Sequence, residues 1–196
     1  VQGSANYFNG SYNYNWNPDF DAREIVGDDP SDLNDRNYGN NDVEGPDALH
    51  GTHVAGIVGA IRGNDVGMDG VAGNVRIMSV RAVPNCDERD KDVANAIRYA
   101  VDNGATVINM SFGKGYSPYK DAVDDAVRYA LSKDVVLVHA AGNDGKENQF
   151  DNNYANDKFE RRGLFRPKYA ENWIEVGAMT PHNDETLTAS FSNWSA

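Results

Sequence analysis

The sequence has a single cysteine, Cys86, so the chain cannot form an internal disulfide bond. No apolar run approaches the ~20 residues that a helix needs to cross a bilayer, so the sequence predicts no membrane span. Positive charge is scarce, since 18 Lys and Arg stand against 30 Asp and Glu and the formal net charge is −12. That balance argues against nucleic acid and anionic membranes as partners, and it is compatible with bound cations.

What the sequence does contain is the composition of an ordinary globular protein. Its 196 residues are 40% hydrophobic and 24% charged, which is enough for one sizeable core. Residues 1–44 differ from the rest, because Asn, Asp and aromatic residues follow one another there without a sustained helical or strand period. The sequence therefore predicts an irregular insertion over residues 1–44 and a folded domain over residues 45–196.

Several aspartates gather at the end of the predicted insertion. They are Asp28, Asp29, Asp32, Asp35 and Asp42. Carboxylate oxygens suit hard cations, but the spacing does not match an EF-hand, because Arg36 occupies a position where a ligand is required. The composition is otherwise typical of turns, so a solvated acidic loop is the favoured interpretation.

Residues 50–60, with the sequence HGTHVAGIVGA, predict a helix built from small and apolar side chains. Val54, Ile57 and Val58 recur at the helical spacing, and so little polar surface predicts a buried helix. His50 in its first turn would then lie at the rim of a core, where an imidazole can act as a general base. A histidine that only packs or caps the helix is the simpler interpretation for His50 taken alone. His53, on the same face of the helix, is expected to be packed or hydrogen-bonded and not catalytic.

From Val75 onward, apolar runs alternate with segments of helical period. This order predicts an α/β fold with three layers, in which a mostly parallel sheet lies between helices. The expected helices are residues 90–103 and 122–131, and the expected strands are residues 75–83, 105–112, 134–141, 172–179 and 187–191. His139 falls within an apolar strand, so it is predicted to be buried and neutral.

Two short segments follow strands of this predicted sheet, at the edge where ligands bind in such folds. They are Ser111-Phe112-Gly113 and Gly142-Asn143. The Asn143 carboxamide could stabilise the negative charge that develops on a carbonyl oxygen during acyl transfer. An asparagine beside glycine is also common in turns, and the residues alone support both interpretations equally.

Three blocks, HGTHVAG at residues 50–56, NMSFG at 109–113 and HAAGNDG at 139–145, resemble the subtilisin-like serine peptidases, or subtilases, in order and spacing. The resemblance extends from about Gly45 to the C-terminus, and residues before Gly45 look like an insertion found in some bacterial subtilases. It implies a subtilisin-like fold, incomplete at both ends of this chain, with peptide bonds hydrolysed by an Asp-His-Ser triad. It also implies an extracellular or cell-envelope location in bacteria and polypeptide substrates.

The resemblance assigns roles to particular residues. His50 corresponds to the general base and Asn143 to the oxyanion-hole donor. The substrate-binding segments correspond to Ser111, Phe112, Gly113, Ala141 and Gly142. Phe112 is expected to line the pockets, and a loop near Asp87-Glu88-Arg89 is expected to supply the opposite edge. No cofactor is required, and Asn64 matches a side-chain ligand of a structural calcium site.

Two members of the triad are not recognisable in this sequence. No strand ending in an Asp-Ser/Thr-Gly turn precedes His50, and no Gly-Thr-Ser-Met-Ala block follows it. The chain is therefore predicted to be inactive as given, and a non-catalytic peptide-binding domain of the same fold is the alternative. A zinc hydrolase that uses His50 and His53 fits poorly, because helical zinc pairs are four residues apart with a Glu between them.

Overall fold

The computed structural model describes residues 2–45, 47–84, 88–148, 158–159 and 169–194. Its centre is a parallel sheet of three strands in the order β1 (Val107–Met110), β2 (Val136–Ala140) and β3 (Trp173–Val176). These strands lie within three of the predicted ones, so the α/β arrangement is confirmed. In the register of the sheet, Met110 pairs with His139, and His139 pairs with Glu175.

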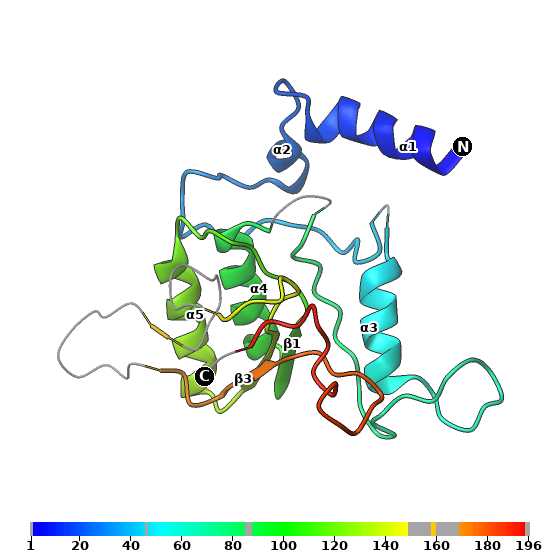
Figure 1. The fold of residues 1–196 in the computed structure, drawn as a ribbon. Coiled ribbons are helices and arrows are strands. Elements are labelled where there is room, and N and C mark those ends of the chain that lie inside the picture. Colours follow the sequence, from blue (N-terminus) through cyan, green and yellow to red (C-terminus); the bar gives the residue numbers. More distant parts are fainter. Residues whose placement is uncertain (1, 46, 85–87, 149–157, 160–168, 195–196) are drawn as a thin grey trace.

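Helices α4 (Asp90–Asp102) and α5 (Lys120–Ser132) lie side by side and pack against the sheet, as Figure 1 shows. Each helix buries apolar residues at the predicted spacing, with Val93 and Ile97 from α4 and Val123 and Val127 from α5 no more than 2% exposed. Leu137 of β2 is fully buried between them and the rest of the core. This cluster holds the strand ends in place, and the segments that follow β1 and β2 start from it.

Helix α3 (Leu49–Gly59) forms as predicted but contains no buried residue, so the prediction of a buried helix is wrong. Figure 1 shows it apart from α4 and α5, on the side where β1 forms the edge of the sheet. Its contacts are with the segment after it: Val71 and Ala72 donate backbone hydrogen bonds to Ile57 and Val58, both at 2.9 Å. Contact with one extended segment leaves most of a helix open to solvent.

Two predicted strands are also wrong. Residues 75–83 form no strand, and Val75 and Ile77 are 47% and 51% exposed. This segment runs along Gly59 of α3, and no strand among the described residues pairs with it. Residues 187–191 contribute only an isolated bridge between Met179 and Thr188. An apolar, β-branched run forms a strand only where a partner supplies the other half of its hydrogen bonds.

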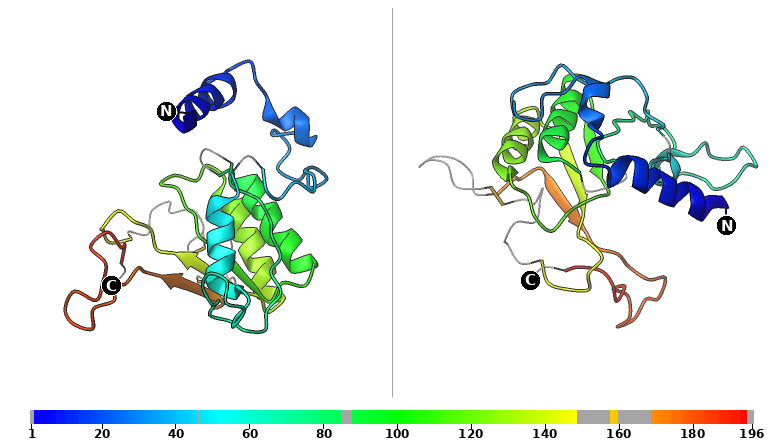
Figure 2. Two further views of the ribbon diagram at one scale, coloured as in Figure 1. Left: turned by 90° about the vertical axis from the view of Figure 1, so that its right-hand side faces the viewer. Right: turned by 90° about the horizontal axis from the view of Figure 1, so that it is seen from above.

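Residues 1–44 are more regular than predicted. They contain the helices α1 (Gln2–Gly10) and α2 (Ala22–Val26) and the π-helical turn η1 (Ser11–Asn15). Figures 1 and 2 show α1 projecting from the body of the molecule. Helix α2 has a local sequence feature that favours its start. The Asp21 carboxylate accepts a hydrogen bond from the Arg23 amide at 2.8 Å and caps the helix.

The acidic segment after α2 is held against α4 by ion pairs, so the interpretation of a solvated loop is wrong for Asp28. The Asp28 side chain has no exposed surface and pairs with Lys91 of α4 and with Arg23, the latter at 2.5 Å. Arg23 also donates two hydrogen bonds of 2.9 Å to Asp92 of α4. The protein's own cations therefore neutralise this carboxylate. Asp29, Asp32 and Asp42 are exposed, and Asp35 is half-buried.

Candidate active site

His50 lies in the first turn of α3 with its imidazole exposed to solvent. Together with Asp47, Leu49 and His53 it lines an open hollow at the surface. The Asp47 carboxylate accepts a hydrogen bond of 2.9 Å from the Leu49 amide, which stabilises the start of the helix. His53 is exposed as well, so the interpretation of His53 as a packed residue is wrong. His50 is accessible, as a general base must be.

Asn143 is exposed in a tight turn directly after β2, and this turn is built around Asn193. The Asn193 side chain is buried; its Oδ1 accepts a hydrogen bond from the Asp144 amide at 2.8 Å, and its Nδ2 donates to Asn148 Oδ1 at 3.0 Å. The Asn193 amide donates to the Gly142 carbonyl at 2.9 Å. One buried carboxamide thus fixes the backbone on both sides of Asn143.

Gly142 is required at its position for two reasons. Its φ of 102° lies in the region that side chains rarely adopt, and a Cβ there would lie 2.5 Å from Asn193 Nδ2. The preceding residue, Ala141, is buried and uses both backbone groups: its amide donates to Val176 and its carbonyl accepts from Asn148, each at 2.9 Å. Ala141 and Gly142 therefore support the turn, and Asn143 is the exposed group.

The sequence pattern did not reveal Asn193 and Asn148. Asn193 stands in an Asn-Trp-Ser pattern, which reads as a glycosylation acceptor that is too common to carry weight. In the structure it is only 4% exposed and its amide is used internally. Its function follows from contact with residues almost 50 positions earlier in the chain, and local sequence carries no signal for such a contact.

The segment Ser111-Phe112-Gly113 follows β1 at the same edge of the sheet. The Asn109 side chain donates to Ser111 Oγ at 2.9 Å, and Phe112 packs against the core cluster. The Phe112 ring is therefore partly buried against the core, and its expected place in a substrate pocket stays a prediction. Its carbonyl accepts a hydrogen bond from His139 Nε2 at 2.9 Å. His139 itself is only 6% exposed, so its predicted burial is confirmed.

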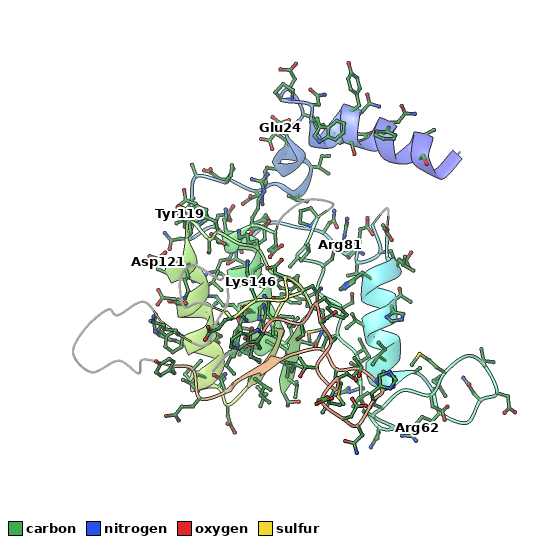
Figure 3. The ribbon with its side chains drawn as sticks, in the orientation of Figure 1. Glu24, Arg62, Arg81, Tyr119, Asp121 and Lys146 are labelled. Carbon is green, nitrogen blue, oxygen red and sulfur yellow. The ribbon has the colours of Figure 1, made fainter. Side chains whose placement is uncertain are left out.

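Charged residues shape the borders of these segments. Asp87 lies outside the described residues, Arg89 is exposed, and Glu88 is buried. Lys114 holds this region to the segment after β1, because its Nζ donates to the Glu88 carbonyl at 2.7 Å and pairs with Asp90 at 2.8 Å. On the other side, a hydrogen bond from Lys146 holds the pKa of the Asp144 carboxyl below its ordinary value. Figure 3 marks Lys146 in the turn after β2.

Within the described residues, His50 does not share its hollow with the other two segments. The residues that line the hollow all belong to positions 47–53, and neither Ser111-Phe112-Gly113 nor Gly142-Asn143 contributes to it. The exposure of α3 accounts for this separation, since among the described residues the helix contacts mainly the segment after it. The candidate site therefore has two parts, the start of α3 and the strand ends.

Asn64 lies in the exposed loop after α3, and its Oδ1 accepts a hydrogen bond from the Val66 amide at 3.0 Å. Figure 3 marks Arg62 in the same loop. Over the described ranges, no group of three or more His, Cys, Asp or Glu side chains is arranged to hold a metal ion. In the same residues, no helix has both the length and the apolar character that a membrane span requires.

The sequence profile of the Subtilase family matches residues 5–196, which is nearly the whole chain. The chain belongs to this family. The match includes most of residues 1–44 as well as the three blocks around His50, Asn109 and His139. Family membership thus agrees with the resemblance that the motifs carry.

Known relatives of this subtilase include a thermophilic serine proteinase of Bacillus sp. (strain AK1), which is 38% identical over 90% of this chain and 38% of its own length. A cell wall-associated protease of Bacillus subtilis (strain 168) is 33% identical over 87% of this chain and 17% of its own length. Among solved structures, Sphericase is similar with a TM-score of 0.59 and 30% identity, over 74% of this chain and 44% of that one. The predicted subtilisin-like α/β fold is therefore confirmed. The chain spans less than half the length of each of these proteins.

Proposed function

We propose that this subtilase is part of the catalytic domain of a serine endopeptidase. The observation that carries the proposal is the family match over residues 5–196, within which His50 and Asn143 are both accessible to a substrate. Two of its relatives are named as a serine proteinase and a protease. The sheet geometry adds support, because Asn143 and Ser111-Phe112-Gly113 lie beyond the carboxyl ends of neighbouring parallel strands, where α/β folds bind their ligands.

In the proposed mechanism, His50 accepts the proton of a serine hydroxyl as that oxygen attacks the scissile carbonyl. The same imidazole then returns the proton to the leaving amine. The Asn143 carboxamide donates a hydrogen bond to the carbonyl oxygen as negative charge develops on it. Loss of such a donor lowers kcat by about 10²–10³, a magnitude that comes from subtilisin itself and not from this chain.

The substrate in this proposal is an extended polypeptide. Ser111-Phe112-Gly113 continues from β1, which is an outer strand of the sheet. An extended peptide can pair with an outer strand through main-chain hydrogen bonds. Backbone pairing of this kind selects for an extended conformation and not for one side chain. The proposed activity is therefore that of an endopeptidase whose side-chain preference depends on the loops around the edge.

The proposal includes the inactivity of the 196-residue chain on its own. Its sequence has neither the Asp-Ser/Thr-Gly nor the Gly-Thr-Ser-Met-Ala block, so no triad can assemble from its recognisable motifs. The test is to incubate the chain and the full-length protein separately with casein and with a serine-directed fluorophosphonate. Cleavage and labelling by the full-length protein alone are expected. If the short chain also cleaves casein and is labelled, the argument from the missing nucleophile is wrong.

Substitutions in the full-length protein test the roles of the two residues. His50→Ala is expected to abolish measurable hydrolysis, and Asn143→Ala to lower kcat by about 10²–10³ with KM little changed. His53→Ala is the matched control, because His53 lies one turn further along the same helix and is also exposed to solvent. If His53→Ala lowers activity as much as His50→Ala does, the assignment of the general base is wrong.

A structural calcium ion and a location outside the cytoplasm are further parts of the proposal. Calcium takes six to eight oxygen ligands, of which the Asn64 side chain would supply one. Asn64→Ala is expected to remove a calcium-dependent increase in Tm of the full-length protein, whereas the control Asn74→Ala keeps it. The name of the Bacillus subtilis relative, a cell wall-associated protease, supports location at the cell envelope or beyond it.

A further inference from the structure

His139 makes three contacts that link the three strands of the sheet. Its Nε2 lies 2.9 Å from the Phe112 carbonyl oxygen, beyond the end of β1, and its Nδ1 lies 3.2 Å from Glu175 Oε1 on β3. Its ring also packs on Trp173, with ring centroids 5.2 Å apart and planes tilted by 42°. Glu175 completes the chain of contacts, because its other oxygen accepts a hydrogen bond of 2.7 Å from the Trp173 indole.

The proton positions in this chain of contacts follow from the chemistry of its groups. A carbonyl oxygen can only accept, so the Nε2 of His139 must carry a proton and donate it to Phe112. The indole nitrogen of Trp173 can only donate, so Glu175 Oε2 must accept. The remaining contact joins His139 Nδ1 to Glu175 Oε1 at 3.2 Å. Glu175 thus fixes the ring orientation in which Nε2 faces Phe112.

A purely packing role explains these contacts less well. His139 occupies a position in an apolar strand, between Val138 and Ala140, where an aliphatic side chain would bury its surface without hydrogen bonds. The histidine instead satisfies a carbonyl of the segment after β1 and reaches a carboxylate whose side chain is 33% exposed. Through Nε2 this histidine holds Ser111-Phe112-Gly113.

We propose that His139, oriented by Glu175, positions Ser111-Phe112-Gly113 for binding an extended peptide. His139 is a positioning residue, since it touches the carbonyl of Phe112 and not the reacting atoms. The inference rests on the proposed function for the identity of the substrate. It adds that the Glu175 carboxylate on β3 affects substrate affinity indirectly. Glu175 orients the His139 ring, and His139 holds the Phe112 carbonyl, so neither His50 nor Asn143 is part of this route.

Four variants of the full-length protein test this inference. Glu175→Leu removes the acceptor for Trp173 and the partner of His139. Glu175→Gln keeps both contacts, because its amide NH₂ can donate to Nδ1 and its amide oxygen can accept from the indole. Glu171→Leu is the control, since Glu171 is an exposed carboxylate just before β3. His139→Leu is a fourth variant, which removes the donor itself. If His139→Leu fails to fold, the Glu175 variants still test the inference, because the Glu175 side chain is partly exposed.

The first measurement is the dissociation constant of a fluorescent peptide whose scissile amide is replaced by a reduced bond. Because this peptide is not cleaved, the result does not depend on catalysis. Glu175→Leu and His139→Leu are expected to weaken binding by about tenfold, which corresponds to the loss of one hydrogen bond of ordinary strength. Glu175→Gln and Glu171→Leu are expected to bind as the unaltered protein does. In hydrolysis, Glu175→Leu and His139→Leu should raise KM and leave kcat within about twofold.

The second measurement is amide hydrogen exchange at residues 111–115 without peptide. Exchange there should be faster in Glu175→Leu and His139→Leu and unchanged in the other two variants. Unchanged affinity and unchanged exchange in Glu175→Leu would overturn the inference, and so would a loss of affinity in Glu175→Gln equal to that in Glu175→Leu. Failure of the full-length protein to hydrolyse any peptide would instead overturn the proposed function, while the affinity and the exchange still decide the role of His139.

Discussion

Helices α3 and α4 are both rich in apolar side chains, but only α4 is part of the core. Ile97 of α4 is 2% exposed, whereas Ile57 of α3 is 41% exposed and Leu49 at its start is 76% exposed. α4 packs against α5 and the sheet, and α3 contacts mainly the extended segment that follows it. Apolar composition therefore indicates which side chains can be buried, and burial itself depends on a partner surface.

The comparison extends to the other faces of the two helices. The start of α4 carries Lys91 and Asp92, which hold the N-terminal segment through Asp28 and Arg23. The start of α3 carries His50 and His53, which face solvent. Apolar contacts thus cover one side of α4, and ion pairs cover another side of it. By contrast, the titratable groups at the start of α3 remain accessible.

The largest difference in the free energy of unfolding is expected between two Leu→Ala substitutions, Leu137→Ala in the core and Leu49→Ala in α3. Leu137 is fully buried, so its truncation should lower the free energy of unfolding by ~2–5 kcal/mol. Leu49 is exposed, and its truncation should change that free energy by less than ~0.5 kcal/mol. Urea unfolding of the 196-residue chain measures both. An equal loss from both variants would mean that α3 is buried in solution and would end the contrast between the two helices.

The next largest effect is expected from Asp28→Ala. This substitution leaves Lys91 and Arg23 without the buried carboxylate that they share, and removal of one partner from such a pair costs about 3 kcal/mol. Amide exchange should become faster over residues 23–38 and remain unchanged in β2. Asp32→Ala is the control, because Asp32 is exposed. Uniformly faster exchange throughout the chain would show that the N-terminal segment is not a separate unit docked on α4.

A smaller effect is expected at the turn that carries Asn143. Asn193→Ala removes the acceptor of the Asp144 amide and the donor to Asn148 Oδ1, at a cost of ~1–3 kcal/mol. Asn193→Asp keeps the acceptor and should lose less stability. Thermal unfolding measures the stability, and kcat of the full-length protein should fall with it because the oxyanion donor is displaced. Unchanged kcat in Asn193→Ala would contradict the role of this residue in positioning Asn143.

The smallest effect concerns alkaline pH. Burial, together with a hydrogen bond to Asp92, raises the pKa of Tyr38 above its ordinary value of 10.0. A raised pKa in the folded state means that the contribution of Tyr38 to stability is complete below pH 10 and is lost as the pH rises further. Tyr38→Phe should therefore reduce the loss of stability between about pH 9 and pH 11. Urea midpoints measure it, with Tyr12→Phe as the control, since Tyr12 is 74% exposed.

The sequence predicted the elements whose signal is local. The helices over residues 90–103 and 122–131 and the three central strands follow from periods of apolar residues, and the structure has them with shorter bounds. The prediction failed for residues 75–83, where the same kind of run lacks a partner strand among the described residues. It also failed for α1 and η1, because their residues have no apolar period that pattern reading could detect.

By itself, the sequence determined the family, the α/β class and the two residues proposed for chemistry, because motifs and periods are properties of neighbouring residues. Only the tertiary structure decided that α3 is exposed, that Asn193 holds the turn around Asn143, and that His139 holds Phe112. Asn193 lies 49 positions from Asp144, and His139 lies 27 positions from Phe112. Contacts over such separations depend on how the sheet aligns its strands, and no local pattern of side chains specifies that alignment.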